Sequence, residues 1–68
     1  MNKPELIYDS RGASGNIFSI LGEVRRILKE QGRLGDYEKL WMRVKGASSY
    51  EEALRILGEE VTLIDIAD

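Results

Sequence analysis

The side chains that most often carry out chemistry in proteins are scarce in this sequence. It contains no histidine and no cysteine, so acid–base or nucleophilic chemistry would fall to carboxylates, lysine, tyrosine or serine. Two pairs of glutamates are adjacent, Glu51 with Glu52 and Glu59 with Glu60. Adjacent side chains diverge on a helix, so neither pair forms a shared acid–base site. The serines have no visible base to activate them. We therefore expect no catalytic residues and no enzymatic activity.

The same two absences limit metal binding. Without histidine and cysteine, the ordinary ligands of zinc, copper, haem and iron–sulfur clusters are missing. Only an oxygen-ligated ion would be possible, and the sequence has no Asp-rich calcium loop. We expect no metal and no cofactor.

One segment, Ser10 to Asn16, resembles a ligand-binding loop. Its glycines would let backbone N–H groups approach an anion, and a following helix would offer its positive end. The candidate anion- or partner-binding residues are Arg11, Gly12, Ser14, Gly15 and Asn16. The segment lacks the lysine of a GxxxxGK[ST] loop and the GxGxxG pattern, and Asp9 would repel an anion. An ordinary strand-to-helix connection is the leading interpretation, and a ligand sensor or a protein-contact loop is the alternative.

The densest group of basic residues lies between positions 25 and 33. On a helix, Arg25 and Lys29 share one flank with Phe18 and Gly22. An aromatic ring beside two cations could stack on a base and contact phosphates, which makes a nucleic-acid-binding accessory protein the alternative function. The leading interpretation of this flank is a solvated helix side whose Phe18 packs beneath a neighbouring helix, next to the small Gly22.

The apolar spacing predicts the elements that would position these side chains. Ile17 to Leu28 follows a helical repeat, which predicts a helix near 15–31, capped by Ser14 or Asn16 and ended by Gly32. The same spacing predicts helices near 36–45 and 49–57. Asp36 is a candidate cap for the first of these, and Ser49 with Glu52 matches a capping box at the second. Runs rich in apolar and β-branched residues predict strands near 5–9 and 60–66.

These elements predict an α+β fold that spans residues 1–68 as a single small domain. Its order is β-α-α-α-β, with three helices between two terminal strands and a small two-stranded sheet packed on the helices. Strict alternation of direction would make the strands parallel, but antiparallel pairs are two to three times as common, so we expect an antiparallel pair. The most buried side chains should include Leu21, Val24, Leu28, Leu40, Trp41, Leu54 and Leu57.

Composition and charge indicate whether the protein is folded, in which compartment it acts and what kind of partner it suits. A hydrophobic content of 43% indicates a folded protein. No apolar run approaches the roughly 20 residues of a membrane span, and the lack of cysteine fits a reducing compartment. We expect a cytoplasmic protein without membrane contact.

The charges are unevenly distributed along the sequence. Residues 1–48 carry a net charge of +3 and residues 49–68 a net charge of −5. This polarity suits complementary association better than nucleic-acid binding, which favours a strongly basic domain.

Four segments form a set that covers roughly residues 6–63: Gly15-Asn16-Ile17-Phe18, Ile20-Leu21-Gly22, Val24 with Arg25-Arg26, and Ser49-Tyr50-Glu51-Glu52-Ala53-Leu54. This set resembles an uncharacterised family of small bacteriophage, prophage and mobile-element proteins. The sequence departs from that pattern in a longer Arg33-Leu34-Gly35 connection and a more acidic tail. The resemblance implies a phage-like origin and a shared fold, and it implies no active-site residue.

Taken together, these features lead us to expect a small, non-enzymatic protein-interaction module that modulates a host or phage macromolecule. The candidate partner-binding residues are Phe18, Arg25, Lys29, Ile64 and Ile66. A two-stranded sheet has open edges, and strand 61–66 carries apolar side chains on both faces. The face turned away from the helices would expose either Thr62, Ile64 and Ile66, or Val61 and Leu63. We expect a second chain to cover it, either as a twofold homodimer or as a protein partner.

Overall fold

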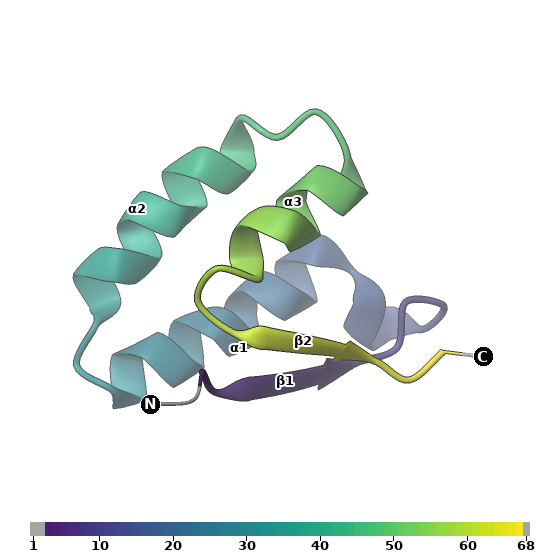
Figure 1. Ribbon diagram of the computed structural model, residues 1–68, viewed down its shortest axis with the longest axis horizontal. Coiled ribbons are helices and arrows are strands. Elements are labelled where there is room, and N and C mark those ends of the chain that lie inside the picture. Colours follow the sequence, from purple (N-terminus) through teal and green to yellow (C-terminus); the bar gives the residue numbers. More distant parts are fainter. Residues whose placement is uncertain (1–2, 68) are drawn as a thin grey trace.

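The computed structural model describes residues 3–67 and has the element order predicted from the sequence. Strand β1 (Glu5–Tyr8) leads through a short 3-10 turn, η1 (Ala13–Gly15), into helix α1 (Ile17–Glu30). Helices α2 (Leu34–Lys45) and α3 (Tyr50–Leu57) follow, and strand β2 (Thr62–Asp65) comes last. The fold is therefore α+β, with three helices between two strands, as Figure 1 shows.

The two strands lie side by side and run parallel (Figure 1), so the antiparallel pairing expected from the sequence is wrong. Glu5 pairs with Thr62 and Tyr8 with Asp65. The physical reason is the number of connections between β1 and β2, which is four: residues 9–16, 31–33, 46–49 and 58–61. Each connection reverses the chain, so an odd number of helices returns β2 to the direction of β1 (Figure 1).

The helix ends are determined largely by local hydrogen bonds. Asn16 caps α1, since its side chain accepts a hydrogen bond from the Phe18 N–H at 2.8 Å. Ser49 caps α3 in the same way, accepting from Glu52 N at 3.1 Å. The glutamate of this capping box bonds one residue further back than expected, because its carboxylate accepts from Ser48 N and Oγ.

Helix α2 begins at Leu34, two residues before the predicted start, because Asp36 does not cap it. Asp36 lies within the first turn, where its carboxylate accepts a hydrogen bond from Arg33 Nε at 2.8 Å. Gly32 ends α1 with a φ of +71°, the left-handed conformation that glycine adopts without penalty. The predicted stop at Gly32 is therefore confirmed.

The core lies between the helices and one face of the sheet. Five of the seven side chains predicted to be most buried are buried: Leu21, Val24, Leu28, Leu40 and Leu57. Trp41 and Leu54 are only partly buried and pack at the margin of the core. Leu6 and Tyr8 of β1 point inward, whereas Ile7 between them is 63% exposed. No helix within residues 3–67 is long and apolar enough to cross a membrane.

Candidate binding surfaces

The candidate anion loop, Ser10 to Asn16, uses most of its backbone donors within the chain. Asp65 accepts a hydrogen bond from Ser10 N at 3.1 Å, and the Asp9 carboxylate accepts from Arg11 N at 2.9 Å. The amides of three further loop residues donate to backbone carbonyls nearby: Gly12, Gly15 and Asn16. An anion would have to displace these bonds, so the geometry favours the structural interpretation, an ordinary connection between β1 and α1.

The glycines of this loop have steric rather than anion-binding roles. Neither Gly12 nor Gly15 has a positive φ; within residues 3–67 only Gly32 does. Gly15 is buried, and a Cβ atom there would lie 2.3 Å from the Asp9 carbonyl oxygen. Only glycine permits that approach of two backbone segments.

Asp65, at the end of β2, is the charged group that holds this loop to the sheet. Its carboxylate accepts hydrogen bonds from Ala67 N at 2.9 Å and from Ser10 N, and these donors lower the pKa of Asp65. Burial raises the pKa of Tyr8 and of Tyr50, and the negative charge of Asp65 raises both further. Both phenols are therefore neutral at physiological pH, which suits hydrogen bonding rather than base catalysis.

The basic flank of α1 differs from its expected arrangement. Phe18 is 69% exposed, so the expectation that it packs beneath a neighbouring helix is wrong. A Cβ atom at Gly22 would have no neighbour within 4 Å, so no other helix packs against this glycine. Arg25 and Lys29 are exposed and form no ion pair among residues 3–67. In contrast, Arg26 bridges two glutamates of its own helix, as expected from their spacing.

Phe18 stands at a groove that the sequence did not reveal. The groove has a volume of about 420 Å³ and lies between the start of α1, the end of α2 and the start of α3. Most of its lining is apolar: Ile17, Phe18, Leu21, Trp41, Val44, Lys45, Ala47, Ser48, Ser49, Tyr50 and Ala53. Lys45 Nζ lies 5.8 Å from the centroid of the Trp41 ring, within cation–π range.

Sequence reasoning missed this groove because its walls come from segments far apart in the chain. The available signal was local: Trp41 and Lys45 are one turn apart on α2, and the small residues Ala47 and Ala53 leave space beside them. The spacing of apolar residues along a helix does not distinguish a residue at the edge of the core from one inside it.

The outer face of the sheet is a second apolar surface, and it lies apart from the groove residues. Parallel pairing places Ile7 opposite Ile64, both on the face turned away from the core. Ile66, just beyond β2, is 60% exposed. Val61 is fully buried and Leu63 packs against the core, so the outward set is Thr62, Ile64 and Ile66, the first of the two alternatives predicted. Thr62 and Ile66 are exposed, and Ile64 is partly buried. Ile7 extends this face and was not anticipated.

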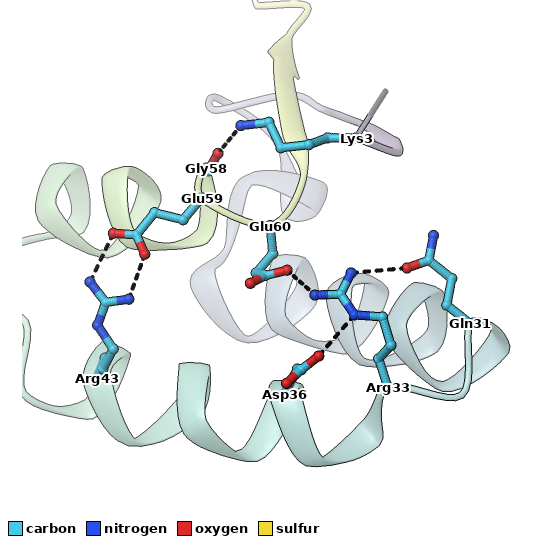
Figure 2. A network of polar contacts seen from close by, with 8 residues as sticks. All are labelled: Lys3, Gln31, Arg33, Asp36, Arg43, Gly58, Glu59 and Glu60. Atoms are coloured by element: carbon cyan, nitrogen blue, oxygen red, sulfur yellow. Dashed lines mark hydrogen bonds and ion pairs between the residues drawn. The ribbon is translucent and has the colours of Figure 1, made fainter. Parts of the chain in front are cut away.

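Ion pairs occupy the side of α2 that faces the α3–β2 turn (Figure 2). Arg43 holds both carboxylate oxygens of Glu59, at 2.5 and 2.8 Å, and lowers the pKa of that carboxyl group. Arg33 bonds to Asp36 and to Glu60. The charge polarity of the sequence is thus partly neutralised inside the molecule, because basic residues of α2 meet acids that follow α3.

Comparison of the chain with protein-family models, with curated proteins and with solved structures gives no match. The inference of function therefore starts from the surfaces of this chain.

Proposed function

We propose that this protein is a small, non-enzymatic protein-interaction module that binds a partner in the groove beside Phe18. The observation that carries the proposal is the exposure of Phe18, 69%, at the mouth of an apolar groove. Burying a phenylalanine side chain is favourable by about 1.5–3 kcal/mol. Aromatic side chains in pockets that exclude water commonly dominate protein–protein affinity.

The proposal includes a phage-encoded protein that acts in the cytoplasm on a host or phage macromolecule. The phage-like origin rests on the resemblance of the four segments named above. The cytoplasmic setting is supported by the absence of cysteine from the sequence.

The test compares two substitutions of exposed apolar side chains. Phe18→Ser removes the groove residue, and Met42→Ser removes a side chain of similar exposure, 63%, that does not line the groove. Each variant is used as bait in extracts of the presumed host, with captured proteins quantified by mass spectrometry. A partner retained by wild type and Met42→Ser but lost by Phe18→Ser supports the proposal. Equal capture by all three folded proteins would reject the groove as the binding site.

The outer face of the sheet supports a second part of the proposal, a twofold homodimer. Ile7 and Ile66 are exposed β-branched side chains, and the partly buried Ile64 lies opposite Ile7 in the sheet. Pairing of this face with its copy would cover all three and leave the groove free. Sedimentation equilibrium at concentrations on the order of tens of micromolar tests this. We expect wild type to dimerise and Ile64→Lys to be monomeric, whereas a folded, soluble wild-type monomer would reject the dimer.

A nucleic-acid-binding accessory protein is the second candidate function. The observation in its favour is that exposed Phe18 shares a helix flank with Arg25 and Lys29, which form no ion pair among residues 3–67. Phosphate contacts release counterions, so such binding would weaken steeply with salt. Titration with a single-stranded oligonucleotide at several salt concentrations distinguishes this function from protein binding, and Arg25→Gln with Lys29→Gln should reduce the salt slope.

A further inference from the structure

We propose that the occupant of the groove is an amphipathic helix with acidic residues beside its apolar stripe. This inference rests on the proposed protein-binding function and adds the chemistry of the partner. It follows from two properties of the groove: the kind of backbone that forms its walls and the sign of the charges at its rim.

The walls favour a helical ligand. They consist of the three helix ends and the connection between α2 and α3, and β1 and β2 contribute no residue. A ligand in extended conformation would find no strand edge with which to pair its backbone N–H and C=O groups. A helix satisfies those groups internally and presents apolar side chains at i, i+3 or i+4, and i+7. A volume of about 420 Å³ suits a few such side chains.

The rim favours negative charge on the ligand. Lys45 is the one charged residue in the lining, and Arg25 continues the flank of Phe18 two turns along α1. Neither cation forms an ion pair among residues 3–67. The first turn of α1 contains no acidic residue, so its positive end is not offset by a side chain of the same helix.

On the opposite side of α2, in contrast to the groove, the basic residues form ion pairs. There Arg33 and Arg43 are paired with acids of this chain (Figure 2). At the groove, the Glu52 carboxylate reaches the lining residue Ser48, but it accepts hydrogen bonds from Ser48 N and Oγ and pairs with Arg55. Arg25 and Lys45 have no acidic partner among residues 3–67. A partner helix that carries glutamate or aspartate at the margins of its apolar stripe would supply the missing counter-charges.

Trp41 makes the test direct, because it is the only tryptophan in the sequence and it lines the groove. Two tryptophan-free helical peptides with the same leucine stripe are titrated, one with glutamates and one with lysines at the flanking positions. We expect the acidic peptide to shift the Trp41 emission saturably and to bind at least about tenfold more tightly than the basic peptide.

Matched variants locate the effect. Lys45→Gln and Arg25→Gln should weaken the acidic peptide several-fold, whereas Lys39→Gln, another exposed lysine of α2 that does not line the groove, should not. Phe18→Ser should weaken both peptides. All four positions are exposed, and far-UV circular dichroism verifies that each variant is folded.

The other results separate the inference from the function on which it rests. Equal affinity for both peptides, lost in Phe18→Ser, would overturn the acidic preference while leaving a protein-binding groove. Binding of neither peptide would overturn the acidic helix as occupant, and the capture experiment with Phe18→Ser would still decide the proposed function. A salt-sensitive shift of Trp41 with an oligonucleotide alone would overturn both in favour of nucleic acid.

Discussion

The hydroxyl of Tyr50 donates a hydrogen bond to the backbone carbonyl of Gly15, at a distance of 2.5 Å. The bond joins the first residue of α3 to the turn that precedes α1, 35 positions earlier in the chain. Tyr50 also lines the groove beside Ile17 and Phe18. One hydrogen bond therefore holds two walls of the proposed binding site in register.

Replacement of Tyr50 by phenylalanine should affect both stability and the groove. The variant keeps the ring but leaves the Gly15 carbonyl without its donor, and a hydrogen bond of this kind contributes about 1 kcal/mol. We expect the urea midpoint of unfolding to fall by a corresponding amount and the emission of Trp41 to change. An unchanged midpoint would show that water replaces the hydroxyl at no cost.

The raised pKa of Tyr8 and of Tyr50 predicts a loss of stability in alkaline solution. An acid whose pKa is higher in the folded protein stabilises the fold below its unfolded pKa, about 10, and this contribution is lost as pH rises through the folded pKa. Denaturant midpoints measured from about pH 8 to 12 should therefore decline, and less steeply in Tyr50→Phe. Parallel declines in the two proteins would contradict this assignment.

Asp65 predicts a loss of stability in acid. Its folded pKa is lowered by the N–H groups of Ala67 and Ser10, so its contribution is present above the unfolded pKa, about 3.9, and is lost as pH falls through the folded value. Asp65→Asn keeps an acceptor oxygen and removes the charge. We expect its melting temperature to depend less on pH below about pH 4 than that of wild type. The same pH dependence in both proteins would show that other carboxylates cause the loss of stability in acid.

Two glycine-to-alanine substitutions should act in opposite directions. In Gly15→Ala the new methyl group would lie 2.3 Å from the Asp9 carbonyl oxygen, so the backbone must move and the free energy of unfolding should fall. Gly22 lies inside α1 with nothing within 4 Å. Its replacement by alanine should stabilise the protein by about 0.5–1 kcal/mol. Thermal melts of both variants measure the contrast, and a stable Gly15→Ala would show that the contact relaxes easily.

Truncation of the core distinguishes the centre from the margin. Leu28 is fully buried, and Leu28→Ala should cost about 2–5 kcal/mol, enough to unfold a domain of this size. Leu54 is only partly buried, so Leu54→Ala should cost less. Chemical denaturation of the two variants measures the difference, and equal losses would place Leu54 at the centre of the core.

The sequence predicted the elements well because their signals are local. The caps Asn16 and Ser49 and the stop at Gly32 act through neighbours within a few residues. The direction of β2 relative to β1 depends instead on the reversals of the chain at all four connections between them. The general frequency of antiparallel pairs does not contain that information. Asp36 failed as a cap because Arg33 binds its carboxylate.

The candidate site was predicted less well, because exposure depends on contacts between distant segments. Phe18, Arg25 and Lys29 were identified by type and spacing, but the structure turns Phe18 outward beside a groove that α2 and α3 complete. Alternation along the strand left two alternatives for its outer face, and the packing of Leu63 against the core decides for the one that contains Ile64 and Ile66. Ile7 lies on the same face because the parallel register pairs it with Ile64, and that register was not predicted from the sequence.

The parallel pairing of β1 with β2 has a consequence for synthesis of the protein. Glu5 meets Thr62 only after all three helices have been made, and contacts so distant in sequence form slowly. While β2 is still within the ribosome, β1 has no partner strand, although Leu6 and Tyr8 are already available to the helices. Until β2 has been synthesised, the backbone edge of β1 stays unpaired, and an unpaired strand edge is prone to aggregation.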